Sequence, residues 1–436
     1  MERPDIVILG AGESGVGAAI LAKKLGLRPF VSDRGNIAQS TQQHLESQGI
    51  AFESGQHSEA IIMEADLIIK SPGIPDQAPL IQRLRAAGKA VIAEVEFAAR
   101  HTNATLIGIT GSNGKTTTTQ LLYRILQQGD LDVAMGGNVG ESFARLVATR
   151  PAAYYVLELS SFQLDGIDHL HSHIALLLNI TPDHLDRYEY KLELYAQSKY
   201  RITRNQQSKD WLIYNAADQN IAALLNAQPP LATKIPVDLP SPHGPLEVKG
   251  HAYDLSQSTL LGPHNRFNAH CAIEAALLLG LSPDQIQQGI NGFVNAPHRL
   301  EQVATKEGVL YINDSKATNV DSVYYALKAM DRPIVWIAGG IDKGNEYDKL
   351  EPLVEEKVHA MICLGVDNVK LLEVFGPRVE ETEEVRTMPD AIATAKRMAR
   401  EGEVVLLSPA CSSFDLFDNF AARGDQFREE VLKLPD

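Results

Sequence analysis

Short apolar segments alternate with segments of helical periodicity along the whole chain. Clear examples are residues 5–10 (DIVILG), 105–110 (TLIGIT), 174–180 (IALLLNI), 333–338 (PIVWIA) and 403–408 (EVVLLS). Apolar runs of roughly four to eight residues between Gly, Pro, Asp or Asn are typical of parallel strands that are buried on both faces. The alternation with helices predicts an α/β fold built from three doubly wound units.

The length of the chain agrees with this division, since 436 residues correspond to about three domains of roughly 150 residues. A helix is expected at Glu94–Arg100, and a new strand begins near Thr105. A second break is expected at residues 295–297. Residues 228–258 are rich in proline and polar residues, which predicts loops or short strands within the middle domain. The expected domains are residues 1–93, 94–297 and 298–436.

Composition narrows the class of protein. Lys and Arg number 40 against 55 Asp and Glu, which leaves a net charge of −15 and argues against a general attraction to nucleic acid or to an anionic membrane. The three scattered cysteines predict neither a disulfide framework nor a zinc cluster, as expected for the cytoplasm. No apolar run of about 18 residues predicts a membrane helix, and the N-terminus has no secretory pattern.

The strongest local signal is a glycine-rich turn after a predicted strand, at residues 107–117 (IGITGSNGKTT). Backbone N–H groups in such a turn can surround phosphate oxygens, and the following helix adds partial positive charge. Lys115 would reach the β- and γ-phosphates, and Thr116 would place its hydroxyl on Mg²⁺. The strict pattern requires glycine where this chain has Ile109. The alternative is a glycine-rich turn that binds no nucleotide.

Acidic residues at the ends of neighbouring strands are candidate partners of the magnesium ion. Glu158 ends one apolar strand, and the segment NITPDHLDR at residues 179–187 follows another. His184 in that segment and Lys199 on the next predicted helix are considered with it. Each of the three has a plain alternative: Glu158 could face water, His184 could cap a loop, and Lys199 could be a solvated charge.

A second glycine-rich turn at residues 6–15 (IVILGAGESG) matches G-x-G-x-x-G after a strand, and Asp33 supplies an acid further along. This pattern indicates a diphosphate at a helix N-terminus with an acid on a sugar or base. NAD, FAD and a UDP-sugar all satisfy it. The phosphate loop in the same chain makes redox chemistry, and with it NAD and FAD, the less favoured interpretation.

Taken together, the motifs resemble the Mur ligase family, and within it the branch that adds D-glutamate. They follow the order of the family across nearly the whole chain. NDSKATN and SPACSSFDLFDNF point to that branch, and the Asp-Asn-Pro-Arg motif expected of the diaminopimelate-adding relative is not found. The motifs are LGAGESG, KSPGIP, GSNGKTTT, GGNVG, LELSSFQL, NITPDHLDR, GPHNRFN, APHRL, NDSKATN, GGIDKG and SPACSSFDLFDNFAARG.

The resemblance implies a Rossmann-like N-terminal domain for the UDP substrate, a central P-loop domain for ATP and a Rossmann-like C-terminal domain for the amino acid. It implies ATP-driven amide formation: the alanyl carboxylate of UDP-N-acetylmuramoyl-L-alanine becomes an acyl phosphate, which the amine of D-glutamate attacks. It also implies two Mg²⁺ sites, a CO₂-derived carbamate on Lys199, small-molecule partners only, a monomer and a place in cytoplasmic peptidoglycan precursor synthesis.

Residue roles follow from the matching motif positions. Lys115, His184 and Lys199 would be catalytic. The metal ligands would be Thr116, Glu158, His184 and carbamylated Lys199. The ATP-binding set would be Gly111, Ser112, Asn113, Gly114, Lys115, Thr116, Thr117, Asn268, Arg299 and Asp314. The UDP-substrate set would be Ser14, Gly15, Asp33, Arg34, Ser71, Gly73, Asn138, Ser160 and His184.

For D-glutamate, the resemblance implicates Lys316, Thr318, Lys343, Ser413 and Phe420. A dicarboxylate requires cations and hydroxyls, which this set supplies. The alternative for Lys343 is a surface turn, and Phe414 and Phe420 could instead be core aromatic residues.

Three competing functions stay open from the sequence. The first is another ligase of the superfamily, which adds glutamate to folate or a different amino acid to the peptidoglycan precursor. The second is a nucleotide-regulated binding protein without turnover, which would bind ATP without forming an acyl phosphate. The third is a dehydrogenase that uses the first glycine-rich turn, which a nicotinamide titration would reveal.

Overall fold

The computed structural model describes residues 3–241 and 243–435. The chain divides into two compact units. The first unit holds the chain up to Leu239 together with residues 248–251 and 268–291, and the second unit holds the rest. The first unit contains two large parallel sheets and the second unit contains one large sheet, so the α/β fold predicted from the apolar pattern is confirmed.

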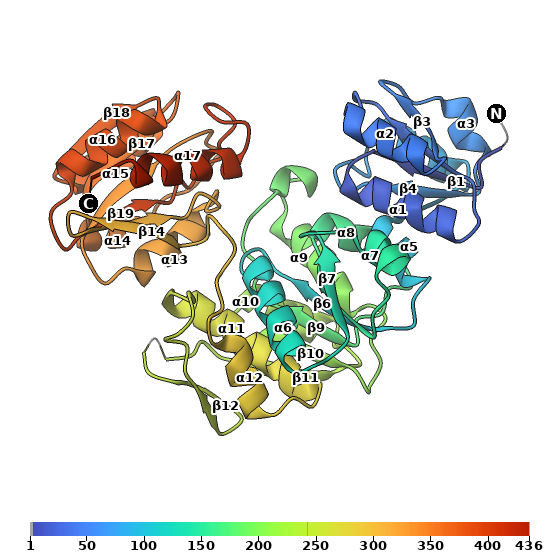
Figure 1. Ribbon diagram of the computed structural model, residues 1–436, viewed down its shortest axis with the longest axis horizontal. Coiled ribbons are helices and arrows are strands. Elements are labelled where there is room, and N and C mark those ends of the chain that lie inside the picture. Colours follow the sequence, from blue (N-terminus) through green and yellow to red (C-terminus); the bar gives the residue numbers. More distant parts are fainter. Residues whose placement is uncertain (1–2, 242, 436) are drawn as a thin grey trace. The chain divides into compact units, whose positions relative to one another are not determined.

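The N-terminal sheet has five parallel strands in the order β3-β2-β1-β4-β5, the doubly wound arrangement expected for a Rossmann-like domain (Figure 1). Its strands are β1 (Ile6–Leu9), β2 (Pro29–Asp33), β3 (Ala51–Ser54), β4 (Leu67–Lys70) and β5 (Ala90–Ala93). Its helices are α1 (Glu13–Lys24), α2 (Gln39–Ser47), α3 (Glu59–Glu64), α4 (Pro79–Ala86) and α5 (Glu94–Ala99). Apolar residues of α1, α2 and α5 pack on one face, and those of α3 and α4 pack on the other.

The central sheet has six parallel strands in the order β11-β10-β9-β6-β8-β7. Its strands are β6 (Thr105–Thr110), β7 (Val133–Gly137), β8 (Tyr154–Glu158), β9 (Ile174–Leu177), β10 (Trp211–Asn215) and β11 (Thr233–Val237). The helices are α6 (Lys115–Gln128), α7 (Phe143–Thr149), α8 (Ser161–Asp165), η1 (Leu185–Arg187), α9 (Leu192–Tyr200), η2 (Arg201–Thr203), α10 (Gln219–Ala227), α11 (Gly262–Leu278) and α12 (Pro283–Ile290). Short strands β12 (Leu246–Val248) and β13 (His251–Tyr253) lie in the segment expected to hold loops or short strands.

The second unit holds a sheet in the order β14-β15-β19-β16-β17-β18. All its pairs are parallel except β14 with β15, which is an antiparallel hairpin. Its strands are β14 (Glu301–Lys306), β15 (Val309–Asn313), β16 (Ile334–Ala338), β17 (Val358–Leu364), β18 (Glu381–Val385) and β19 (Val404–Leu407). Its helices are α13 (Val320–Ala329), α14 (Glu351–Lys357), α15 (Val369–Phe375), η3 (Gly376–Arg378), α16 (Met388–Met398) and α17 (Phe420–Leu432). Helices α13–α15 cover one face, and α16 and α17 cover the other.

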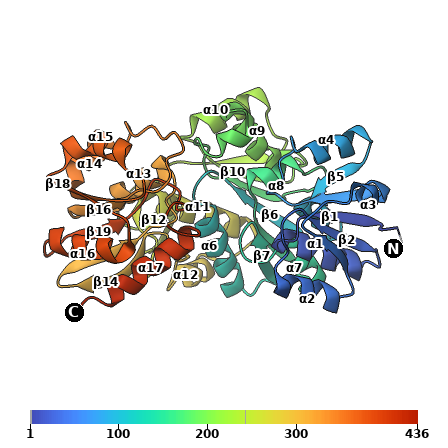
Figure 2. The ribbon, with the colours of Figure 1, turned by 90° about the horizontal axis from the view of Figure 1, so that it is seen from above.

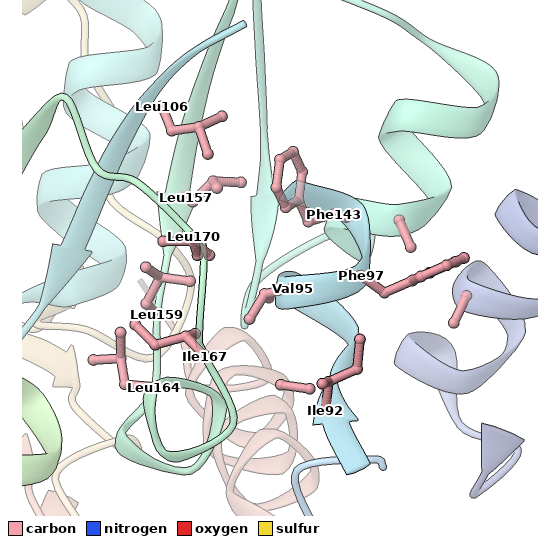
Figure 3. Close-up of a cluster of buried hydrophobic side chains, with 14 of the residues drawn as sticks. Ile92, Val95, Phe97, Leu106, Phe143, Leu157, Leu159, Leu164, Ile167 and Leu170 are labelled. Atoms are coloured by element: carbon pink, nitrogen blue, oxygen red, sulfur yellow. The ribbon is translucent and has the colours of Figure 1, made fainter. Parts of the chain in front are cut away.

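One continuous apolar core joins the N-terminal and central sheets. Figure 3 shows Val95 of α5 near Phe143 of α7, with Ile92 of β5 and Leu157 of β8 in the same cluster. Helix α1 also packs against α7, as Figure 2 shows. The boundary expected at residue 93 therefore falls inside a shared core.

Two predictions about composition can be compared with the structure. The three cysteines are free and buried, so the prediction that they form no disulfide framework is confirmed. Within the described residues, no helix is long and apolar enough to cross a membrane.

Candidate active site

The loop between β6 and α6 has the backbone of a phosphate-binding turn. Strand β6 is largely buried, and helix α6 begins at Lys115 directly after Gly114. Gly114 has a φ of +84°, in the left-handed region, and a Cβ at this position would overlap the amide oxygen of Asn268. The first N–H groups of a helix and its dipole favour a bound anion. The structure thus builds the loop that the sequence predicts, with Asn268 beside it.

A clamp that was not predicted from the sequence holds this loop. The backbone N–H of Asn113 donates to Oδ1 of Asn179 (2.8 Å), and Nδ2 of Asn179 donates to the carbonyl of Asn113 (3.0 Å). The hydroxyl of Ser112 donates to the carbonyl of Thr181 (2.9 Å). Asn179 opens the NITPDHLDR motif directly after an apolar strand, so its position was the available signal. The clamp fixes the phosphate loop against the loop that carries His184.

Glu158 lies at the carboxyl end of β8 and is only 2% exposed. The hydroxyl of Thr116 donates to Oε2 (2.8 Å), and Nδ2 of Asn138 donates to Oε1 (2.8 Å). The alternative in which this carboxylate faces water is therefore wrong. The structure brings together Thr116, Glu158 and Asn138, which the sequence placed in the metal and substrate sets.

Lys199 is buried near the end of α9, with 1% of its surface exposed. Its Nζ donates to the carbonyl of Gly111 (2.8 Å) and lies 4.4 Å from the centre of the Tyr195 ring. The Nζ of Lys115 donates to the same carbonyl (2.7 Å). Burial, and next the charge of Lys115, hold the pKa of Lys199 well below its usual value. The interpretation of Lys199 as a solvated charge is wrong, because its amine is a buried neighbour of the phosphate loop.

His184 lies in a strained turn after β9, with a φ of +52°. Its side chain is half exposed, and Nε2 lies 3.6 Å from Oδ2 of Asp183. The ring of Phe162 packs edge-on against the His184 ring, with the ring centres 5.3 Å apart. The predicted role of His184 as a metal ligand stays a prediction.

The first glycine-rich turn is built by close packing. Gly10 has a φ of +98°, and a Cβ here would overlap the hydroxyl of Ser71 at the end of β4. A Cβ on Gly15 would overlap the carbonyl of Gly10, so α1 can lie this close to the end of β1 only because residue 15 has no side chain. The hydroxyl oxygen of Ser71 is buried and has no hydrogen-bond partner. An unpaired buried hydroxyl is costly, so this atom marks a place where a polar ligand would be favoured.

Two predicted substrate residues also organise the local backbone. Asp33 accepts hydrogen bonds from the N–H groups of Ala11 (2.7 Å) and Gly35 (2.8 Å), which ties β2 to the glycine-rich turn. Ser160 caps α8 and accepts from the N–H of Gln163 (3.3 Å). Three other predicted residues of the N-terminal domain are partly or fully exposed, namely Ser14, Arg34 and Gly73. Their contacts with a substrate stay predictions.

In the second unit, the structure brings Asp314 and the turn around Arg299 together. The N–H of Leu300 donates to Oδ1 of Asp314 (3.2 Å), and the hydroxyl of Ser408 donates to Oδ2 (3.0 Å). Burial raises the pKa of Asp314 to about 7, against the opposing effects of these hydrogen bonds and the Arg299 charge. His298 and Leu300 both have positive φ values and flank Arg299. The turn is therefore held in an uncommon conformation that the buried carboxyl supports.

Four of the residues predicted to bind D-glutamate lie on loops that follow β15, β16 and β19, and the fifth, Phe420, begins α17. The Nζ of Lys316 lies 3.9 Å from the centre of the Phe420 ring, and Ser413 is buried. The N–H of Thr318 donates to the carbonyl of Lys316 (2.8 Å). Lys343 is exposed in its glycine-rich turn, which agrees with the alternative interpretation of this segment as a surface turn.

A β-bridge joins two of these loops. Ile341, two residues before Lys343, pairs with Ser412, the neighbour of Ser413. Phe414 is 69% exposed, so the option that it is a core aromatic residue is wrong. The bridge brings the Lys343 turn to the Ser413 segment at the carboxyl ends of neighbouring strands, where ligands bind in open α/β sheets.

Arg423 was not identified from the sequence, although it lies in the last motif. Its side chain is 1% exposed, and burial lowers its pKa to about 10. Nη2 donates to the carbonyl of Ser315 (2.9 Å), and Nε donates to the Ser315 hydroxyl (3.0 Å). Weaker hydrogen bonds reach the carbonyls of Gly339 and Cys411 (3.4 Å each). One guanidinium thus holds together the three loops that carry the predicted amino-acid residues.

The predicted metal ligands do not form a conventional protein cage. Across the part of the chain that the structure describes, no group of three or more His, Cys, Asp or Glu side chains is arranged to hold a metal ion. The donors that meet at the phosphate loop are the carboxylate of Glu158 and the hydroxyl of Thr116. Such oxygen donors suit Mg²⁺, which usually combines one or two protein ligands with waters and substrate phosphates.

Comparison with known protein families covers most of the chain. Residues 4–93 match the Mur ligase MurD-like N-terminal domain, and residues 109–276 match the Mur ligase middle domain. Residues 298–411 match the Mur ligase glutamate ligase domain.

Full-length relatives agree with these matches. A UDP-N-acetylmuramoylalanine–D-glutamate ligase of Porphyromonas gingivalis is 49% identical, with 99% of each chain covered. A protein of the same name from Christiangramia forsetii is 47% identical over 98% of this chain and 99% of its own. The Salinibacter ruber ligase of that name is 39% identical over 100% of this chain and 99% of its own.

Solved structures share the fold at low sequence identity. MurF ligase from Thermotoga maritima, in complex with ADP, has a TM-score of 0.62 and 13% identity, with 93% of this chain and 95% of that chain covered. UDP-N-acetylmuramate-alanine ligase MurC from the same organism has a TM-score of 0.59 and 17% identity, with coverage of 98% and 99%. With its phosphate loop, its three large sheets and these full-length relatives, the chain belongs to the Mur ligase family, in the group of the UDP-N-acetylmuramoylalanine–D-glutamate ligases.

Proposed function

We propose that this protein is an ATP-dependent ligase that joins D-glutamate to UDP-N-acetylmuramoyl-L-alanine in peptidoglycan precursor synthesis. The observation that carries the proposal is the arrangement around the phosphate loop. There the amines of Lys115 and Lys199 both donate to the carbonyl of Gly111, and the hydroxyl of Thr116 donates to Glu158. A turn that binds phosphate supports ATP use, and the relatives named above supply the amino-acid substrate.

The chemistry requires activation because a carboxylate is a poor electrophile. An oxygen of the alanyl carboxylate would attack the γ-phosphorus of ATP, ADP would leave, and an acyl phosphate would form. The amine of D-glutamate would then attack the carbonyl carbon, with loss of a proton and of inorganic phosphate. Lys115 would offset negative charge on the phosphates, and binding would hold the three substrates in line.

The residues at the phosphate loop fit a magnesium ion. Thr116 and Glu158 would hold it, and its chemistry would be to neutralise charge on the ATP phosphates. A second ion is proposed near His184 and Lys199. The partly exposed side chain of His184 supports access to that place.

We further propose that Lys199 carries a carbamate. Carbon dioxide adds to a neutral amine: an N–C bond forms, and one proton leaves the nitrogen. Burial and the Lys115 charge lower the pKa of Lys199 and so favour the neutral amine. The product is an anion with two oxygens, which would replace a second cation next to Lys115 with a group able to bind a metal.

The UDP substrate is proposed to bind at the first glycine-rich turn. The support is the buried hydroxyl of Ser71, which has no hydrogen-bond partner and lies against Gly10. The N-terminus of α1 would favour the diphosphate.

D-Glutamate is proposed to bind in the second unit at the loops of Lys316, Lys343 and Ser413. ATP and UDP-linked sugars are cytoplasmic metabolites, so we propose that compartment, with small molecules as the partners and a monomer as the working form.

The central test is phosphate release from ATP with Mg²⁺ and UDP-N-acetylmuramoyl-L-alanine. D-Glutamate, L-glutamate, L-lysine and meso-diaminopimelate are supplied separately. Release with D-glutamate alone, together with a product heavier by one glutamyl residue, is expected. Release with another amino acid would refute the proposed specificity, and absence of release with all four would refute the ligase function. Lys115→Ala should abolish release, whereas the exposed Lys234→Ala serves as the matched control.

The carbamate has a separate test. The protein is incubated with isotopically labelled bicarbonate, and the carbamate carbon is observed by NMR. We expect a signal in the wild type and in Lys234→Ala, and its loss in Lys199→Ala. A wild-type protein that turns over fully but shows no such signal would contradict the carbamate proposal.

A further inference from the structure

Arg187 bridges the N-terminal and central parts of the first unit. Its Nη1 donates to the carbonyl of Gly73 (3.3 Å), and its Nη2 donates to the carbonyl of Pro72 (3.4 Å). The carbon of the same guanidinium lies 4.4 Å from the centre of the Phe162 ring. One planar cation therefore spans from the loop after β4, which carries Ser71, to an aromatic side chain of α8.

Phe162 connects this cation to the His184 loop. Its ring packs edge-on against His184 (5.3 Å between centres) and stacks with Tyr188 at 6.1 Å and an interplanar angle of 10°. Tyr188 packs against Tyr195 (5.4 Å), and the Tyr195 ring lies next to the amine of Lys199. A continuous chain of contacts thus runs from the Ser71 loop to both His184 and Lys199.

Contacts within the N-terminal domain hold a different part of the Ser71 loop from the part that Arg187 contacts. The Nζ of the buried Lys70 donates to the carbonyl of Ile74 (2.8 Å) and lies 3.4 Å from Oδ1 of Asp76. These contacts close the far side of the loop, whereas Arg187 takes the carbonyls of Pro72 and Gly73 next to Ser71. The position of the loop relative to its own sheet is set by Lys70, and its position relative to the central sheet depends on Arg187.

We propose that Arg187 and Phe162 are positioning residues that couple binding of the UDP-linked substrate at the Ser71 loop to the placement of His184. A ligand that orders the Ser71 loop would fix the guanidinium, the guanidinium would fix the Phe162 ring, and the ring would hold His184. This inference rests on the proposed function, because it requires that the UDP substrate binds at that loop.

The test combines substrate binding with turnover. Affinity for UDP-N-acetylmuramoyl-L-alanine and for ATP is measured by calorimetry, and kcat is measured at saturating substrates. The variants are Arg187→Met, Arg187→Lys, Phe162→Leu and the double variant Arg187→Met/Phe162→Leu. Arg83→Met, which removes an exposed arginine on α4, is the control. Arg187 and Phe162 are partly exposed, so the single variants should fold, and thermal unfolding checks this.

Arg187→Met is expected to weaken binding of the UDP substrate about tenfold, the scale of one cation–π contact with two weak charge-assisted hydrogen bonds. It should also lower kcat and leave ATP affinity unchanged. Arg187→Lys should restore only part of both effects, because an ammonium cannot bridge two carbonyls and stack on a ring. Phe162→Leu should lower kcat, and the double variant should be no worse than Arg187→Met, since the two residues act in series.

Two results would overturn the coupling. The first is additive losses in the double variant, and the second is a loss of affinity with kcat unchanged, which would make Arg187 a simple binding contact. Failure of the wild-type protein to bind the UDP substrate is a different outcome, because it refutes the proposed function itself. The wild-type titration thus separates the two failures.

Discussion

Three of the residues predicted for the active site are ionisable groups that the fold buries. Lys199 and Glu158 were each open to an interpretation as a solvated or water-facing group, and both are buried, as is Asp314. The sequence identified all three through their motifs. It could not predict their burial, because α9 has no clear apolar stripe and a strand-end carboxylate can point either way. Burial is the property that lowers the pKa of Lys199 and raises that of Asp314.

Glu94 offers a test of burial at the level of one side chain. One carboxyl oxygen accepts from the N–H of Ala144, the other has no partner, and burial raises the pKa to about 8 from an ordinary value of 4.5. The folded state therefore binds the proton more tightly. The free energy of unfolding should fall as pH rises from 4.5 to about 8.

Glu94→Gln removes this ionisation. We expect a flatter dependence of stability on pH and, above pH 8, a variant more stable than the wild type by on the order of 2 kcal/mol. Denaturant unfolding across this pH range is the measurement. Glu96→Gln is the matched control: burial opposes ionisation there too, but hydrogen bonds from the N–H of Asp168 and from Arg100 outweigh it and lower the pKa of Glu96. The control should lose stability at neutral pH. A parallel pH profile for Glu94→Gln and the wild type would contradict the assignment.

At the scale of elements, the most accurate predictions were those with strong local rules. The strand expected at residues 105–110 and the glycine-rich turn before α6 are present as expected. Strand β14 was not anticipated, because its sequence EQVATK has only two apolar residues between polar ones and resembles a loop. It pairs antiparallel at the edge of its sheet and is only partly buried, so it needs no apolar run. The clamp by Asn179 was also missed, because it depends on two loops that are distant in sequence.

Gly114 tests the phosphate loop as an element. Gly114→Ala should strain a left-handed residue and push Asn268 away, so we expect ATP affinity to fall at least about tenfold. Calorimetric titration with ATP and Mg²⁺ measures this. Gly88→Ala is the control, because Gly88 has a φ of +73° but no neighbouring atom within 4 Å of an added Cβ. It should lose some stability and keep its ATP affinity. Equal ATP binding by Gly114→Ala and the wild type would show that the close approach is unimportant.

At the scale of the whole molecule, helices α1 and α7 form a seam between the N-terminal and central sheets. A Cβ on Gly17 would overlap the hydroxyl of Ser142. The same hydroxyl donates to Glu13 (3.1 Å), which also accepts from Arg145 through Nε (2.7 Å) and Nη2 (2.8 Å). The seam therefore combines a close helix approach with a bidentate ion pair.

Gly17→Ala should force the two helices apart and lower the free energy of unfolding by about 1–3 kcal/mol, the usual cost of overpacking. Ser142→Ala combined with Gly17→Ala should recover part of this loss, since it removes the overlapping oxygen. Thermal and denaturant unfolding provide the comparison. If the single variant unfolds like the wild type, the seam must be more adaptable than its geometry implies.

The core shared across residue 93 has a consequence for recombination between relatives. Ile92 of β5 belongs to one buried cluster with Phe143 and Leu157, and α1 packs against α7, so exchange of the segment before Glu94 replaces only one side of a fitted surface (Figure 3). A chimera joined at that boundary would inherit mismatched side chains on α7 and β8. Successful exchange between homologues should therefore require α7 to travel with the N-terminal segment. The segment that can be exchanged between homologues is therefore defined by the packed surface and not by the domain boundary in the sequence.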